Sequence, residues 1–177
     1  AEFPSPAARG EVEGIDPRSK AAVRRAAASE APLSALVFKT ISDPHVGKLS
    51  VFRVYSGTFR SDSQVLNASR DARERVGHLG WLMGKTQKPV EALGPGEIGV
   101  LTKLKDTFTG DTLCDEGHPI VLPGITFPEP AISFAIQPKT RGDEDKISTA
   151  LHRMAEEDPT LHHHFDPETK QLLVSGM

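Results

Sequence analysis

Apolar and polar residues alternate in short runs along residues 33–122. In Lys48–Val54, Leu49 and Val51 fall on one face of an extended chain, while Phe52 and Val54 fall on the other. A period of two is typical of β-strands. The runs with strand character are Leu33–Ile41, Lys48–Val54, Gln64–Asn67, Glu74–Leu82, Ile98–Leu104, Thr112–Cys114 and Ile120–Leu122. Because turn-forming residues separate them at short intervals, residues 33–122 predict a mainly β domain, a small barrel or sandwich.

The pattern changes after residues 123–130, which hold three prolines and a glycine and predict a proline-rich linker between domains. The elements predicted beyond it are a strand over Ile132–Gln137, a helix over Asp143–Glu157, and strands over Leu161–Phe165 and Gln171–Ser175. Residues 131–177 therefore predict an α+β part with the order β-α-β-β. This is an incomplete ferredoxin-like unit, because the last helix and strand of that fold are missing.

The predicted helix is the clearest element of the chain. Ile147, Ala150, Leu151 and Met154 follow one another at i, i+3, i+4 and i+7 and form a single apolar stripe. Asp158-Pro159 ends the helix, because proline lacks the backbone N–H and disfavours helix in the residue before it. We expect the stripe to pack on the three strands.

Residues 1–32 contain many prolines and glycines with little apolar periodicity, which predicts a linker, an extended connection from a preceding domain. The Ala- and Arg-rich stretch Lys20–Ser29 could instead form one or two helical turns. The chain begins without Met and stops just after an apolar run, so we expect it to be a segment of a longer protein.

Composition indicates a core-forming chain, with 37% hydrophobic and 25% charged residues among 177. The net charge is −3, divided into about +1 over residues 33–122 and −4 over residues 123–177, so any RNA contact needs a local basic patch. Cys114 is the one cysteine, and we expect it to be a small core residue. No apolar run reaches the roughly 20 residues of a membrane span. These features predict a cytoplasmic protein with no membrane partner.

Two glycine motifs resemble phosphate-binding loops but lack the required context. Gly94–Gly99 has the G-x-G-x-x-G spacing, yet a strand pattern follows where a dinucleotide site needs a helix. Gly84-Lys85-Thr86 resembles the end of a P-loop, but position 79 is Leu79 where that loop needs glycine. We interpret both as turns, and we expect no cofactor in this segment.

Three consecutive histidines suggest metal binding. In a strand, His162 and His164 share one face, and Asp166 is a possible third ligand. A metal-dependent enzyme centred on these three residues is therefore an alternative hypothesis. A solvated or RNA-facing strand is the favoured explanation of the histidines, because two ligands on one face are too few for a metal site.

Several cations near predicted turns are candidates for contact with RNA phosphates. They are Lys48, Arg53, Arg60, Arg70, Arg73, Arg75, Lys85 and Lys88. The alternative at each position is a solvated barrel rim, since exposed charges are common on any soluble domain.

The chain resembles elongation factor G in a series of ordered motifs. The most specific are Asp43–Leu49, Phe52–Thr58 and Thr109–Leu113 in the predicted barrel, followed by Phe127–Pro130 and Ala155–Thr160 beyond it. This resemblance covers the β-barrel second domain and the first part of the third domain of that family. The Ala/Arg-rich stretch and the three histidines are unlike the family's usual sequence, so a divergent paralogue fits as well as the main factor.

The resemblance implies a parent protein that hydrolyses GTP on the ribosome and acts in tRNA and mRNA translocation or in ribosome recycling. It implies that GTP and Mg²⁺ bind an absent GTPase domain of the same parent chain, so we expect this fragment to be inactive alone. The implied partners are the ribosome, small-subunit ribosomal RNA and that GTPase domain. Asp158, Pro159 and Thr160 match a family segment near the fusidic acid pocket. A stand-alone β-barrel binding module remains a further alternative.

Overall fold

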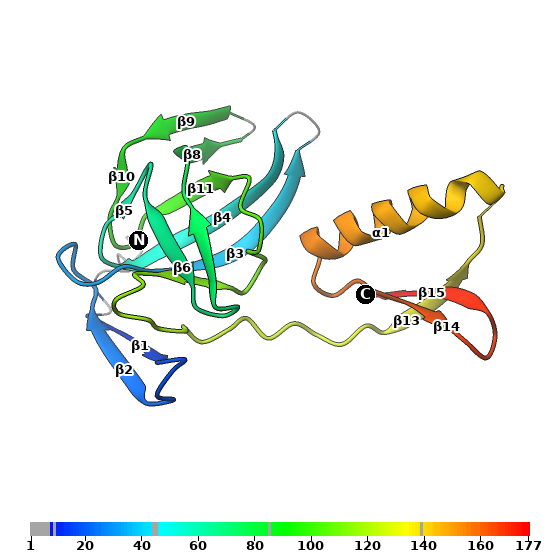
Figure 1. The fold of residues 1–177 in the computed structure, drawn as a ribbon, viewed down its shortest axis with the longest axis horizontal. Coiled ribbons are helices and arrows are strands. Elements are labelled where there is room, and N and C mark those ends of the chain that lie inside the picture. The colour runs from blue at the N-terminus through cyan, green and yellow to red at the C-terminus, as the bar shows by residue number, and fades with distance from the viewer. Residues whose placement is uncertain (1–7, 9, 44–45, 85, 139) are drawn as a thin grey trace, which may run out of the picture. The chain divides into compact units, whose positions relative to one another are not determined.

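The chain forms two compact units, Ala1–Ile125 and Thr126–Met177 (Figure 1). The computed structural model describes residues 8, 10–43, 46–84, 86–138 and 140–177, apart from the side chains of Arg141 and Glu144. The division between the units falls inside the predicted linker, residues 123–130.

The first unit is built from antiparallel strands. In chain order they are β1 (Glu11–Ile15), β2 (Ala22–Ala26), β3 (Ser34–Asp43), β4 (Gly47–Ser56), β5 (Phe59–Arg60), β6 (Gln64–Asn67), β7 (Ala72–Arg75), β8 (Leu79–Met83), β9 (Thr86–Val90), β10 (Ala92–Leu93), β11 (Ile98–Thr102) and β12 (Thr112–Cys114). The main sheet has the order β7-β6-β12-β3-β4-β11-β8-β9. β5 precedes β6, β10 follows β9, and β5 pairs with β10, so the two ends of the sheet are joined into a barrel. The predicted mainly β fold class is confirmed.

Alternation along the strands places one set of apolar side chains inside the barrel. Val37 on β3 and Phe52 on β4 are both fully buried there, and the ring centroids of Phe52 and Phe59 lie 4.7 Å apart. The interior cluster consists of Leu33, Ala35, Val37, Phe52, Val54, Phe59, Val65, Val76, Leu79, Leu93, Leu101, Leu104 and Leu113. Burial of this apolar area is the main stabilising contribution to the unit.

Residues 11–26 form a hairpin where the sequence predicted a linker. β1 and β2 pair antiparallel, so the alternative of helical turns over Lys20–Ser29 is wrong. Val12 and Val23 face the barrel and pack on an outer cluster that contains Leu36 and Cys114. The linker interpretation failed because only two large apolar residues of the hairpin point inward, which is too weak a pattern to recognise.

A buried arginine ties this hairpin to the barrel. The Arg25 guanidinium donates to the carbonyl oxygens of Leu33, at 2.9 Å, and of His118. Burial lowers the pKa of Arg25 from its usual value. At the far end of β1, the backbone groups of Ile15 and Val121 exchange two hydrogen bonds of 2.9 and 2.8 Å. Hydrogen bonds to backbone carbonyls therefore hold the hairpin in addition to its apolar contacts.

Two predicted strands differ in the structure. The run Glu74–Leu82 is divided into β7 and β8, because the chain turns at Val76–His78 while Val76 enters the interior cluster. The run Ile120–Leu122 forms one bridge, between Val121 and Ile15, rather than a strand. In both cases apolar residues are buried without extended pairing, which periodicity alone does not distinguish from a strand.

The second unit has the predicted β-α-β-β order. Its elements are β13 (Ile132–Ile136), the 3₁₀ turn η2 (Arg141–Asp143), α1 (Glu144–Glu157), β14 (His162–Asp166) and β15 (Gln171–Gly176). The sheet has the order β13-β15-β14, and α1 runs along one of its faces (Figure 1). Of the predicted stripe, Leu151 is buried, Ile147 is partly buried, and Ala150 and Met154 are exposed. The helix therefore packs through a narrower stripe than the sequence predicted.

Candidate nucleic-acid interface

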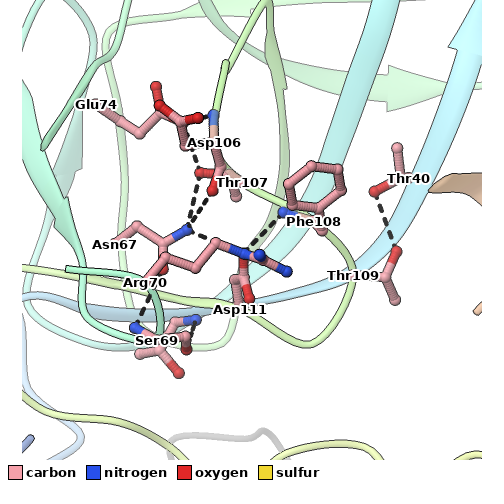
Figure 2. A network of polar contacts seen from close by, with 11 residues as sticks. Thr40, Asn67, Ser69, Arg70, Glu74, Asp106, Thr107, Phe108, Thr109 and Asp111 are labelled. Atoms are coloured by element: carbon pink, nitrogen blue, oxygen red, sulfur yellow. Dashed lines mark hydrogen bonds and ion pairs between the residues drawn. The ribbon is translucent and has the colours of Figure 1, made fainter. Parts of the chain in front are cut away.

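A loop between β11 and β12 carries the most organised polar contacts of the first unit (Figure 2). The Asp111 carboxylate, which is buried, accepts through Oδ2 from the backbone N–H of Phe108 at 2.9 Å and from the Asn67 amide at 2.9 Å. It also pairs with Arg70, whose Nε lies 2.7 Å from the same oxygen. Asp111 therefore joins the loop to the β6–β7 hairpin.

Glu74 holds the other side of the same loop. Its buried carboxylate accepts from the backbone N–H of Asp106 at 2.8 Å and from the Thr107 hydroxyl at 2.8 Å. The backbone N–H of Lys105 is a third donor, at 3.2 Å. Because buried carboxylates need donors to offset desolvation, these contacts fix the path of residues 105–107.

The loop presents an aromatic ring on which two cations lie. Lys48 Nζ is 3.7 Å from the centroid of the Phe108 ring, and the Arg70 guanidinium carbon is 4.4 Å from it. Both distances suit cation–π attraction. Lys48 on β4 and Arg70 in the β6–β7 turn are therefore brought together through Phe108, which was not among the residues predicted from the sequence. The sequence contains no signal for Phe108, because its contacts with the two cations depend on the fold.

The remaining candidates on the β6–β7 hairpin differ in their partners. Arg73 forms an ion pair with Glu116, although both side chains are largely exposed. Arg75, two residues later on β7, is exposed. Arg70, Arg73 and Arg75 thus lie on one hairpin, as predicted, with part of their charge neutralised by Asp111 and Glu116.

The other predicted cations lie elsewhere on the barrel. Arg53 on β4 is partly buried, and among the described residues its Nε has no hydrogen-bond partner. Arg60 on β5 is exposed beside Ala92. Lys88 on β9 is exposed and lies opposite Trp81, which is itself 42% exposed. Lys85 lies outside the described residues. The described candidates are thus spread over β4, β5, β7, β9 and the β6–β7 turn.

Asp158, Pro159 and Thr160 form the turn that follows α1. The Asp158 backbone N–H donates to the Met154 carbonyl, and its carboxylate accepts from the Thr160 backbone N–H at 3.0 Å and hydroxyl at 2.7 Å. This is a side-chain–backbone turn, of the kind that Asp commonly forms. The shape of this turn therefore accounts for Asp158 and Thr160 at these positions.

The histidine run lies on β14 with the predicted alternation. His162 and His164 are exposed, while His163 is partly buried on the opposite face. Asp166 accepts from the Thr169 hydroxyl at 2.8 Å and the Glu168 backbone N–H at 2.9 Å, and these bonds lower the pKa of its carboxyl. Within the described residues, no three His, Cys, Asp or Glu side chains are grouped as a metal site. Asp166 closes the β14–β15 turn instead.

The Gly94–Gly99 motif and Cys114 have structural roles, whereas the predicted turn at Gly84-Lys85-Thr86 includes Lys85, which lies outside the described residues. The Gly94–Glu97 turn is closed by the Glu97 carboxylate, which accepts from the Gly94 N–H at 2.6 Å, and β11 follows at Ile98. The predicted turn is confirmed. Cys114 is fully buried in the outer cluster, and burial raises the pKa of its thiol, so the prediction of a core residue is also confirmed. In the part of the chain that is described, no helix is long and apolar enough to span a membrane.

Comparison with known proteins adds two family matches. Residues 32–116 match the family model described as elongation factor G domain 2, and residues 127–177 match the model described as elongation factor G, domain III. The chain is also similar to a protein of known crystal structure from Thermus thermophilus, with 32% sequence identity and a TM-score of 0.69. That match covers 82% of this chain and 22% of the Thermus protein, so the chain spans about a fifth of its length.

Proposed function

Because the chain belongs to the elongation factor G family, we propose that it is the ribosome-binding and relay segment of a translational GTPase. The observation that carries this proposal is the order of the two matches, domain 2 followed by domain III along one chain. In this proposal the parent protein acts in tRNA and mRNA translocation or in ribosome recycling. GTP and Mg²⁺ bind a separate GTPase domain of that parent, and the segment itself needs neither.

The proposed partner of the first unit is small-subunit ribosomal RNA in the cytoplasm. Arg75 and Lys88 are exposed cations on strands, where they can reach phosphates. Lys48 and Arg70 lie against Phe108, which holds their long side chains in place and reduces the entropy lost on binding. Since the net charge of residues 33–122 is only about +1, a small number of such contacts would define the interface.

The relay role is proposed for the second unit, and the family resemblance supports it. The turn at Asp158–Thr160, which the resemblance relates to the fusidic acid pocket, is fixed by the Asp158 carboxylate directly after α1. A fixed turn at the end of a helix can transmit a displacement of that helix without losing its own shape. Asp158→Ala is therefore expected to alter the response to the parent's nucleotide state without altering binding by the barrel.

The test of ribosome binding is a titration of purified small ribosomal subunits with the 177-residue chain at several salt concentrations. We expect an affinity that falls steeply with salt, because phosphate contacts release counterions. Arg75→Ala should weaken binding and reduce the slope of log affinity against log salt by about one. Arg18→Ala is the matched control, since Arg18 is also exposed but lies in the turn of the β1–β2 hairpin.

Two outcomes would contradict the proposal. Binding that is absent at low salt would favour a stand-alone β-barrel module with another ligand. Equal losses for Arg75→Ala and Arg18→Ala would show that attraction is diffuse and that the β6–β7 hairpin is not the interface. Separately, GTP turnover by the isolated chain above a buffer control would contradict the assignment of GTP hydrolysis to another domain.

A further inference from the structure

The hairpin of β8 and β9 exposes the one tryptophan of the sequence, Trp81. β8 pairs with β11 at Leu79 and Gly80, and the hairpin continues past this pairing to Met83 and Thr86. Leu79, Trp81 and Met83 alternate onto one face of β8. Leu79 is 1% exposed in the interior cluster, whereas Trp81 is 42% and Met83 58% exposed. The face that lines the barrel at Leu79 therefore emerges into solvent at Trp81.

A cation lies next to this indole ring. Lys88 on β9 is the cross-strand partner of Trp81, and its side chain is exposed. Directly paired residues of antiparallel strands project from the same face, with Cβ atoms about 5 Å apart. The flexible stem of Lys88 therefore lets its ammonium group reach a ligand that lies on the Trp81 ring.

The local charge of the hairpin has the opposite sign to that of the whole chain. Between Glu74 and Glu91 the sequence contains Arg75, Lys85 and Lys88 and no Asp or Glu, which gives about +3 in a chain of net charge −3. Lys85 lies outside the described residues and is counted only for its charge. An exposed indole in a region of positive charge is complementary to a ligand that has both a flat apolar surface and negative charge.

Unpaired RNA has both properties in each nucleotide. Any base can stack on an aromatic side chain, and a phosphate adjoins each base along the strand. A base inside a duplex is already stacked on its neighbours, so a duplex offers phosphates but no free base face. An acidic peptide likewise offers negative charge, but its carboxylate side chains have no flat apolar surface. The chemistry of Trp81 and Lys88 therefore favours single-stranded RNA over both.

We propose that Trp81 and Lys88 form a binding site for an unpaired nucleotide, in which the base stacks on the Trp81 ring and the adjoining phosphate pairs with Lys88. This inference rests on the proposed function, in which RNA is the partner of the first unit. It adds a base-stacking contact to the phosphate contacts proposed above. Stacking does not depend on which base is bound, so the site recognises an exposed base rather than a sequence.

The experiment is a fluorescence titration of the 177-residue chain at low salt with oligoadenylate of about eight nucleotides, a length within the usual range of single-strand sites. Because Trp81 is the one tryptophan, its emission reports on this site in the unaltered chain. We expect saturable quenching by the single strand. The same strand paired with oligouridylate, and an octaglutamate peptide of similar charge, should quench much less.

Variants test the two residues through the anisotropy of labelled oligoadenylate. Trp81→Ala should weaken binding by at least about fivefold, and Trp81→Phe should retain most of the affinity, because its ring can still stack. Lys88→Gln should reduce the slope of log affinity against log salt by about 0.7. Phe134→Ala and Arg18→Gln are the matched controls and should bind as the wild type does. Phe134 is 68% exposed in the second unit, and Arg18 is exposed in the β1–β2 turn.

Three results would overturn the inference: equal quenching by the duplex, equal quenching by octaglutamate, or an equal loss of affinity for Trp81→Ala and Phe134→Ala. Its failure is distinguishable from that of the proposed function. Salt-dependent binding of small ribosomal subunits with full affinity for Trp81→Ala would overturn the nucleotide site alone. Quenching by oligoadenylate without binding to small subunits would support the nucleotide site and contradict the ribosomal role.

Discussion

Two carboxylates, Glu74 and Asp111, are buried inside the first unit, where an unpaired charge is costly. Buried acidic pairs often mark catalytic sites. Here the donors to Glu74 come from residues 105–107, and those to Asp111 come from Phe108, Asn67 and Arg70. These carboxylates therefore hold a loop, and through Phe108 they set the positions of two candidate RNA-binding cations.

Ser50 and Ser56 provide a matched pair for testing how buried hydroxyls affect stability. Both lie on β4 and are fully buried. Ser56 contacts the Pro32 carbonyl at 2.8 Å and the Ser34 hydroxyl at 2.7 Å, whereas Ser50 Oγ has no hydrogen-bond partner among the described residues. Ser50→Ala removes a desolvated hydroxyl, so we expect a free energy of unfolding that is unchanged or higher by up to about 1 kcal/mol.

Ser56→Ala removes the same atom, but it takes away the partner that the Ser34 hydroxyl and the Pro32 carbonyl have among the described residues. We expect it to lower the free energy of unfolding by about 1–2 kcal/mol. Urea unfolding of both variants against the wild type measures the difference. A larger loss for Ser50→Ala than for Ser56→Ala would mean that Ser50 has a partner that the described contacts do not include.

At the scale of elements, long and strongly patterned segments could be predicted from the sequence. The helix over residues 143–157 and the strands around Lys48–Val54 have enough consecutive periodic residues to determine their type. The β1–β2 hairpin could not be predicted, because its stability depends on Arg25 reaching the carbonyl of His118, 93 residues away. Local sequence contains no signal for such a contact.

The same reasoning applies to the candidate site. Arg70, Arg73 and Arg75 could be assigned to one surface because a hairpin places neighbours together. The role of Phe108 and the ion pair of Arg73 with Glu116 could not be predicted, because they depend on contacts between segments that are distant in the chain. The sequence identifies the cations, but only the fold shows which of them are paired with a carboxylate.

Gly14 tests whether the hairpin belongs to the barrel. A Cβ atom at this position would lie 2.6 Å from both Ile120 Cγ1 and the Val121 carbonyl oxygen, and the latter is backbone that cannot move easily. Gly14→Ala should therefore push β1 away from residues 120–122. We expect a loss of about 1–3 kcal/mol, the usual cost of overpacking, and faster amide exchange at Ile15 and Val121.

The matched control for this variant is Gly117→Ala, in the neighbouring loop. A Cβ atom there meets nothing within 4 Å, so stability should change by less than about 0.5 kcal/mol. If Gly14→Ala leaves the Ile15 and Val121 amides as protected as in the wild type, the hairpin does not pack against residues 120–122 as described.

At the scale of the whole molecule, the two units differ in how much apolar surface they bury. The barrel has a closed interior cluster and an additional outer one. In the described part of the second unit, Leu151 is the one buried hydrophobic side chain. Ile132, Phe134 and Phe165 share the helix-facing side of the sheet with His163 by register, yet they are 54%, 68% and 62% exposed. α1 therefore covers only part of that face.

This difference predicts two levels of stability in one chain. Amide exchange reports local opening free energies, which rise towards the global value in well-packed cores. We expect amides of β3, β4 and β11 to be at least about 30-fold more protected than those of β13, β15 and α1, which corresponds to about 2 kcal/mol. Exchange measured at two pH values establishes that opening, rather than intrinsic chemistry, limits the comparison. Equal protection in both units would show that they unfold as one, and that the exposed face of the β13-β15-β14 sheet costs the second unit little stability.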